Sequence, residues 1–274
     1  MKKMTQKLLF SLALCVAAMP AVAQMATPTN FTPVPVGEAA PLRFFTNLQG
    51  STLFSSNAKD GKFNMYNGQL NLGLIYNVGM GLDVGFGIHG GMFSPYGMFR
   101  DATAAGMPTG YSQYGAMFGA DIMVRYLAMF SDMFYGGIQA QVGYNYTNLL
   151  PGSTDDVYGK DKDGKAISKG AMNSFIPVLA GIVVGLDFKD AVAFYLFPAV
   201  ELGQTGNYTN TTAPATADRN NGVWKSAVGM QIAVGTAIDL GATKLVIELK
   251  PRMANFSNSN SWGMDATLGA FWDF

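Results

Sequence analysis

Side chains that could carry acid–base or nucleophilic chemistry are few in this sequence. His89 is the only histidine, and a serine–histidine hydrolase needs a hydroxyl and an orienting carboxylate within hydrogen-bonding reach of the imidazole. Asp83 lies six residues earlier on the same strand face, about 20 Å away along an extended chain. Asp121 or a serine on a neighbouring strand could approach His89, but no motif places one there. We therefore predict a protein that is not an enzyme, with His89 in a polar network.

The densest acidic segment does not match a metal-binding loop. Asp155-Asp156 and the run Asp161–Gly164 suggest a calcium loop. With Gly164 at the sixth position of a twelve-residue loop, however, the first and last ligand positions are both glycine. The only cysteine, Cys15, lies in a segment that we expect to be removed, so the mature chain offers no thiolate ligand. We predict no metal and no cofactor.

A larger set of charged residues recurs at spacings that place it on one face of predicted strands. Two interpretations stay open: an ion-pair network that fills a narrow lumen, because buried charges need partners, or a constriction that selects small solutes by charge. Tyr135, Tyr195 and Phe197 share these faces and narrow any pore. The candidate lumen residues are Arg43, Asp83, His89, Asp121, Arg125, Glu201, Lys225, Glu248, Lys250 and Arg252, with Asp239 and Asp265 on the same faces.

These faces belong to alternating segments that we expect to be β-strands. Their opposite faces are apolar and carry no charge, as a bilayer would require, since a charge on the lipid face at mid-membrane costs about 2–4 kcal/mol. No segment after residue 23 has 18 uninterrupted apolar residues, which leaves a closed barrel as the spanning structure. The expected strands are 42–54, 64–77, 81–92, 112–127, 133–146, 174–187, 191–203, 223–238, 244–253 and 263–274.

The connections between these segments alternate in length, which is typical of outer-membrane barrels. We expect an all-β fold, a closed antiparallel transmembrane barrel of about ten strands, with eight or twelve as alternatives and both termini in the periplasm. Pro177, Pro198 and Pro251 lie within strands, where each removes a backbone donor, so we expect bulges or early ends to pairing near the external rim. The long connections are 55–63, 93–111, 147–173, 204–222 and 254–262, and the short ones are 78–80, 128–132, 188–190 and 239–243.

The N-terminal residues divide into two segments. Lysines precede an apolar run from Leu8 to Ala18, and Ala21-Val22-Ala23 forms a small-x-small site, so we predict that residues 1–23 are a secretory signal peptide. A lipoprotein signal around Cys15 is the alternative. Residues 24–40 are rich in Pro and Thr, and we predict an extended periplasmic tail, with a short plug that enters the barrel as the alternative. The barrel then covers residues 41–274.

The C-terminal residues match a known assembly pattern. Residues 267–274 alternate and end on an aromatic residue, with Gly269 sixth and Trp272 third from the end. This pattern resembles the closing strand of Gram-negative outer-membrane β-barrels, and the whole chain resembles small barrels of the OmpA, OmpX and OmpW type. The resemblance implies localisation in the outer membrane, contact with its lipid, and an assembly signal at Gly269, Trp272 and Phe274 that the barrel-assembly machinery reads. Fold-level resemblance does not fix function.

Composition agrees with a lipid-facing surface and excludes one class of partner. Only 13% of the residues are charged, and the chain has 33 glycines. Three of its 18 basic residues lie in residues 1–23, which leaves 15 against 18 acidic residues and no basic surface for nucleic acid. We expect a structural barrel or a narrow, passive, porin-like channel for a small solute. The alternatives are a surface adhesin that binds a ligand through long loops such as 147–173, and a transporter that uses an apolar lumen patch at Leu179 and Val183.

Overall fold

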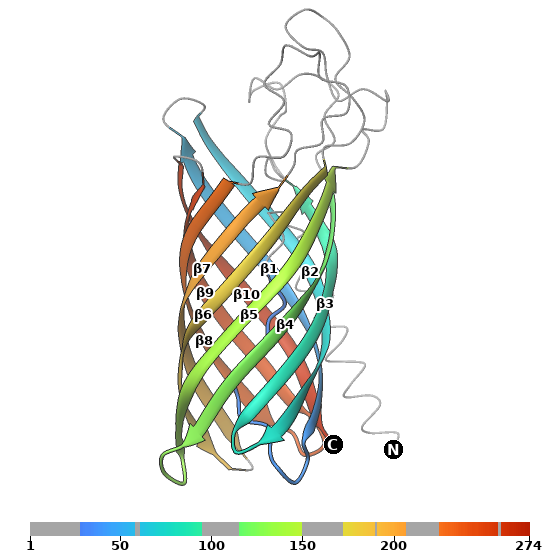
Figure 1. Ribbon diagram of the computed structural model, residues 1–274, viewed down its shortest axis with the longest axis vertical. Helices are drawn as coiled ribbons and strands as arrows, with labels where there is room; N and C mark the ends of the chain where they lie inside the picture. The colour runs from blue at the N-terminus through green and yellow to red at the C-terminus, as the bar shows by residue number, and fades with distance from the viewer. Residues whose placement is uncertain are drawn as a thin grey trace, which may run out of the picture.

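The computed structural model describes residues 28–57, 61–94, 115–149, 172–189, 191–206, 225–256 and 259–274, and these residues form a closed antiparallel β-barrel (Figure 1). Each strand pairs with its neighbours in the sequence, and β1 pairs with β10 to close the sheet. The ten strands are β1 (Leu42–Asn57), β2 (Gly61–Gly79), β3 (Leu82–Ser94), β4 (Gly115–Met129), β5 (Phe134–Leu149), β6 (Met172–Phe188), β7 (Val192–Gly206), β8 (Lys225–Asp239), β9 (Lys244–Phe256) and β10 (Ser259–Asp273).

The predicted fold is confirmed, and every predicted strand is present with bounds that differ by at most four residues. The predicted short connections are tight turns at one end of the barrel, where β1 also begins and β10 ends; we name this the turn end and the opposite one the loop end. In the tightest turn, Gly79, Met80 and Gly81 all have positive φ, a backbone conformation that glycine adopts without steric cost. No helix among the described residues is long and apolar enough to cross a membrane.

Two of the connections that we expected to be long are instead continuations of strands. β1 and β2 pair as far as Asn57 and Gly61, and β9 and β10 pair as far as Phe256 and Ser259. The hydrogen-bonded ladders of these two hairpins continue beyond the lipid-facing part of the barrel at the loop end. A strand outside the lipid needs no apolar face, so its sequence does not have to alternate. The other three expected long connections lie largely in residues that the structure does not describe, although β3, β5, β6 and β7 extend two to three residues into them.

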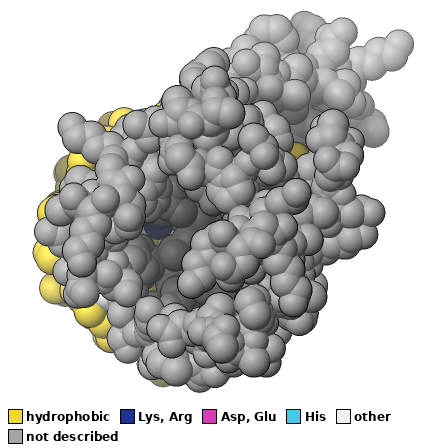
Figure 2. All heavy atoms as spheres, turned by 90° about the horizontal axis from the view of Figure 1, so that it is seen from above, with side chains coloured by type: hydrophobic (Ala, Val, Ile, Leu, Met, Phe, Trp, Pro, Cys, Tyr) yellow, Lys and Arg dark blue, Asp and Glu magenta, His cyan; other side chains and the backbone are white. Residues whose placement is uncertain are grey.

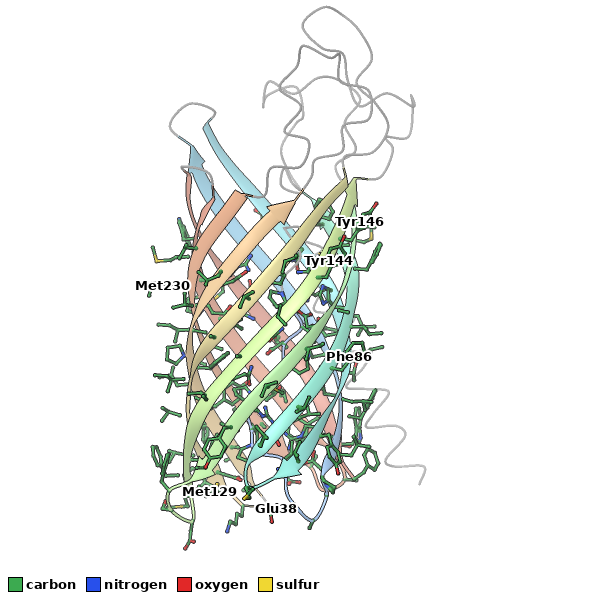
Figure 3. The ribbon with its side chains drawn as sticks, viewed as in Figure 1. Glu38, Phe86, Met129, Tyr144, Tyr146 and Met230 are labelled. Carbon is green, nitrogen blue, oxygen red and sulfur yellow. The ribbon has the colours of Figure 1, made fainter. Side chains whose placement is uncertain are left out.

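The outer surface of the barrel is an apolar belt. Phe86 and Met230 are 52% and 64% exposed and point away from the barrel, Tyr144 and Tyr146 lie towards the loop end, and Met129 lies at the turn end (Figure 3). Exposed apolar side chains in such numbers are stable only against hydrocarbon, because water would penalise each of them. Strand residues of this belt include Leu70, Leu74, Val84, Ile88, Phe118, Ile122, Val124, Ile138, Val142, Val178, Ile182, Leu196, Val200, Val228, Ile232, Ile247, Leu249 and Met264.

Prolines interrupt three seams of the sheet without changing its register. Between β6 and β7 the pairing stops after Gly181↔Ala199 and resumes at Val184↔Leu196, so two residues on each strand are skipped around Pro198. The same two-residue gap occurs at Pro177 between β5 and β6 and at Pro251 between β8 and β9. The expectation of bulges or early ends to pairing is therefore wrong: a missing N–H removes local bonds, but flanking pairs hold the register.

Candidate functional site

The most informative feature of the interior is that residues 28–36, which we name the plug, lie inside the barrel. Thr29, Phe31, Val34 and Val36 are each at most 4% exposed, and the described chain starts within the lumen (Figure 1). For residues 28–36 this corrects the periplasmic tail expected over 24–40 and follows the alternative of a short plug, whereas residues 24–27 lie outside the described residues. The physical reason is that the plug's carbonyls and side chains satisfy lumen groups that would otherwise be buried without partners.

Two arginines hold the middle of the plug. Arg43 donates from Nη1 to the carbonyl oxygen of Val34 at 2.8 Å and from Nη2 to that of Pro35 at 2.9 Å. Arg125 donates from Nη1 to the carbonyl of Thr32 at 2.7 Å and from Nη2 to that of Val34 at 2.8 Å. Both guanidinium groups therefore converge on one carbonyl oxygen, and we name this arrangement the arginine clamp.

The barrel wall orients both arginines independently of the plug. Arg43 binds Asp273 through Nε at 2.6 Å and Nη2 at 2.8 Å, and its guanidinium lies 3.7 Å from the centre of the Phe271 ring. Arg125 binds Asp83 through Nε at 2.6 Å. Because β1 and β10 are paired neighbours, as are β3 and β4, each ion pair also bridges a seam of the sheet.

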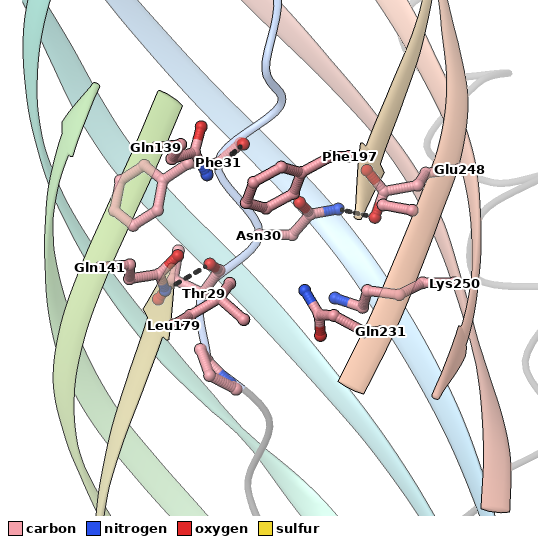
Figure 4. Close-up of a pocket in the computed structure, with 12 residues that line it drawn as sticks. Thr29, Asn30, Phe31, Gln139, Gln141, Leu179, Phe197, Gln231, Glu248 and Lys250 are labelled. Carbon is pink, nitrogen blue, oxygen red and sulfur yellow. Dashed lines mark hydrogen bonds between the residues drawn. The ribbon is translucent and has the colours of Figure 1, made fainter. Parts of the chain in front are cut away.

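The first residues of the plug contact the polar half of the lumen. The Thr29 backbone N–H and hydroxyl both donate to Oδ2 of Asp121, at 2.9 and 2.6 Å, and Gln141 donates to the Thr29 carbonyl at 2.8 Å. Asn30 donates to Glu248 at 2.8 Å and to Thr267 at 3.1 Å (Figure 4). The plug is thus bonded to strands on opposite sides of the barrel.

Apolar contacts fix the plug between these polar groups. The Phe31 ring packs edge-on against Phe45 with ring centres 5.4 Å apart. Room for the plug comes from glycines on the lumen face of β3: a Cβ on Gly85 would lie 2.9 Å from Phe31, and one on Gly87 would lie 2.6 Å from Thr29. Leu179 and Val183, the lumen patch that we considered for apolar transport, belong to the same buried cluster as Phe31.

The predicted lumen residues fall into distinct groups, and the structure describes the side chains of all of them except one. Arg43, Asp83, His89, Asp121, Arg125 and Glu248 contact the plug or a residue that holds it. Lys250 and Arg252 instead lie 3.6 and 3.4 Å from Asp265 on β10, and Glu201 is partly buried. Lys225 lies in β8, but its side chain is outside the described residues. Asp239 accepts from the backbone of Gly241 in an exposed turn.

The environment of His89 differs from that of a catalytic triad. Its Nδ1 lies 3.0 Å from Asp121 Oδ2 and also 3.0 Å from the Thr29 hydroxyl, which itself donates to Asp121. In a triad the hydroxyl and the carboxylate lie at opposite ring nitrogens; here both face the same nitrogen. Sequence reasoning missed Thr29 as a partner, since 60 residues separate it from His89.

A small pocket separates the plug from the wall. Phe31, Leu179 and Phe197 form its apolar side, while Gln139, Gln141, Gln231 and Lys250 form its polar side (Figure 4). Its free volume is about 10 Å³, room for roughly one water molecule. Viewed from the loop end, a basic side chain is visible inside the barrel (Figure 2).

The predicted assembly signal lies on the closing strand. Trp272 stacks on Phe44 of β1 with ring centres 5.7 Å apart, and the Phe274 backbone bonds to Leu42 in both directions. A Cβ on Gly269 would lie 2.4 Å from the Asn47 side chain, so only glycine fits that position. Recognition of these residues by assembly machinery stays a prediction.

Comparison with solved structures finds matches at low sequence identity. The β domain of the Bordetella autotransporter BrkA has a TM-score of 0.47 at 11% identity, covering 85% of this chain and 100% of that one. The translocator domain of the autotransporter NalP from Neisseria meningitidis gives 0.46 at 10% identity, over 85% and 88%. The outer-membrane protease OmpT from Escherichia coli gives 0.43 at 10%, over 89% and 100%.

No protein-family model and no curated protein sequence matches the chain. The closed sheet and its apolar belt define an integral outer-membrane β-barrel protein. In the described part of the chain, the lumen is occupied by the chain's own N-terminal segment, residues 28–36.

Proposed function

We propose that the protein is a narrow channel that its own plug closes, a more specific function than the structural barrel or narrow, passive, porin-like channel expected from the sequence. The observation that carries this proposal is the arginine clamp together with the contacts of Thr29 and Asn30, which bond residues 28–36 to several strands. Hydrogen bonds to charged groups contribute about 1.5–3 kcal/mol each, so several of them keep the closed state dominant.

The plug can leave without opening the sheet. Each hydrogen bond between the described plug and the wall uses a side chain of the wall, while the β1–β10 ladder that closes the barrel involves no plug residue. Residues 37–39 are exposed and join the plug to β1 at the turn end, and a Cβ on Gly37 would meet nothing within 4 Å. These exposed residues supply the hinge, and release occurs towards the turn end.

Conductance in planar bilayers tests the proposal. The full mature chain is expected to stay closed, whereas deletion of residues 24–36 is expected to produce regular openings. Adding a synthetic peptide of residues 28–36 to the side facing the turn end should close the deleted channel again. A correctly folded deletion variant without openings would remove the channel and leave a permanently closed structural barrel.

A second candidate function is surface binding at the loop end. The β1–β2 and β9–β10 hairpins continue past the apolar belt and present paired strands there (Figure 1). The 147–173 connection that we expected to bind a partner lies largely outside the described residues. Removal of residues 152–169 with retention of the barrel should abolish binding to cells or matrix components if this surface is the contact.

A further inference from the structure

We propose that release of the plug uncovers a binding site for tetrahedral oxyanions such as phosphate and sulfate, formed by Arg43 and Arg125. This inference rests on the proposed function, because the site exists only when the plug has left. It adds a ligand class to the channel and assigns both arginines a second role.

The plug itself occupies the site as an imitation of an oxyanion. Three carbonyl oxygens, those of Thr32, Val34 and Pro35, accept four N–H bonds from the clamp, and the Val34 oxygen is shared by both guanidinium groups. A phosphate or sulfate presents the same pattern: one oxygen shared between two guanidinium groups and one further oxygen for each. A carbonyl at each position is a neutral substitute for an anionic oxygen.

The clamp stays preorganised when the plug leaves. Asp83 and Asp273 hold the arginine Nε atoms at 2.6 Å, and neither carboxylate belongs to the plug. The Phe271 ring supports Arg43 from the wall as well. Four guanidinium N–H groups, two on each arginine, would then face the lumen without their present acceptors. In the open channel water solvates these donors, and an oxyanion that accepts from both guanidinium groups at once replaces that water with charge-assisted hydrogen bonds.

Charge at the clamp also favours an anion. Lys244 lies 3.8 Å from Asp273, so the two ion-paired groups around the clamp together contain three cations and two carboxylates. Guanidinium groups are hydrogen-bond donors with no acceptor, which excludes a metal cation as the ligand. By contrast, Lys250 and Arg252 share Asp265 at another level of the lumen, and neither makes a hydrogen bond to the described plug.

Bilayer recordings of the variant that lacks residues 24–36 test the site, with chloride as the current carrier. Millimolar sulfate or phosphate is expected to reduce the chloride current. Arg43→Lys and Arg125→Lys keep the positive charge but lose the paired N–H donors of the guanidinium group. Each should weaken the block of the chloride current at least about tenfold. Lys189→Gln, which removes an exposed cation at the same end of the barrel, should leave the block unchanged.

The outcomes separate the two proposals. An open channel that neither anion blocks, or a block that both lysine variants retain, overturns the oxyanion site and leaves the plug-closed channel intact. A deleted channel that never opens overturns the proposed function instead.

A second measurement uses the full chain and does not need the deletion to fold. Val36 is buried while the plug lies inside the barrel. A maleimide should therefore label the Val36→Cys variant only when the plug has left the barrel. Sulfate that binds the open state shifts the population towards it, and the labelling rate should rise several-fold over chloride at equal ionic strength. The added Arg125→Lys substitution should remove the dependence on sulfate; a rate that never depends on sulfate contradicts the site.

Discussion

At the scale of single residues, each arginine of the clamp has two kinds of partner, a carboxylate of the wall and carbonyl oxygens of the plug. Arg125 satisfies Asp83 in the wall and two carbonyls of the plug, so one side chain links the barrel to the segment that closes it. Removing one partner of a buried ion pair is far more costly than replacing both, because it leaves an unpaired charge.

Arg125→Gln should therefore destabilise the folded barrel by about 3–5 kcal/mol. The double substitution Arg125→Gln with Asp83→Asn should recover much of that loss, because no charge then remains unpaired. Urea unfolding in lipid vesicles measures both differences. A single variant as stable as the parent would show that the ion pair contributes nothing.

Gly87 tests how the plug is accommodated. A valine there places atoms where Thr29 now lies, since even its Cβ would come within 2.6 Å of that side chain. We expect Gly87→Val to displace the plug and raise channel activity with the barrel still folded. Gly68→Ala is the control, because a Cβ there meets nothing within 4 Å. Equal behaviour of the two variants would contradict the close approach.

At the scale of strands, the sequence predicted most of the fold. Alternation identifies a strand because lipid and lumen demand opposite side chains at successive positions. The hairpin ends at Asn57 and Gly61 were missed because pairing outside the belt needs no apolar face. At Pro198 the expectation was a bulge or an early end to pairing, but the structure has a two-residue gap in the ladder. Nothing in a sequence distinguishes a skipped backbone bond from an inserted residue.

The belt itself makes a prediction about depth. Ile182 is 58% exposed on β6, well inside the belt, whereas Met80 lies in the turn at 88%. Ile182→Lys should cost about 2–4 kcal/mol and Met80→Lys at most about 1 kcal/mol. Unfolding midpoints in vesicles check this; equal costs would mean that hydrocarbon does not contact the middle of β6.

At the scale of the whole molecule, the candidate site depends on contacts that no local pattern reveals. Asn30 reaches Glu248 across 218 residues of sequence, and Thr29 reaches Asp121 across 92. The inward direction of the lumen charges could be read from alternation, but their partners could not. A usable signal was present nonetheless: lumen-facing glycines on β3 leave space, and Phe31, Val34 and Val36 supply apolar side chains to fill it.

A disulfide between the plug and the wall tests the central claim most directly. The position of a Cβ on Gly87 lies 3.2 Å from Cβ of Thr29, close to the separation that a disulfide requires. In a chain that begins at residue 24 and so lacks Cys15, Thr29→Cys with Gly87→Cys should cross-link nearly completely on mild oxidation of the membrane-inserted protein, as mass spectrometry of the joined peptides would show. The pair Thr29→Cys with Gly68→Cys should not. Two free thiols in the first pair, in a barrel shown to be folded, would contradict a plug inside the lumen.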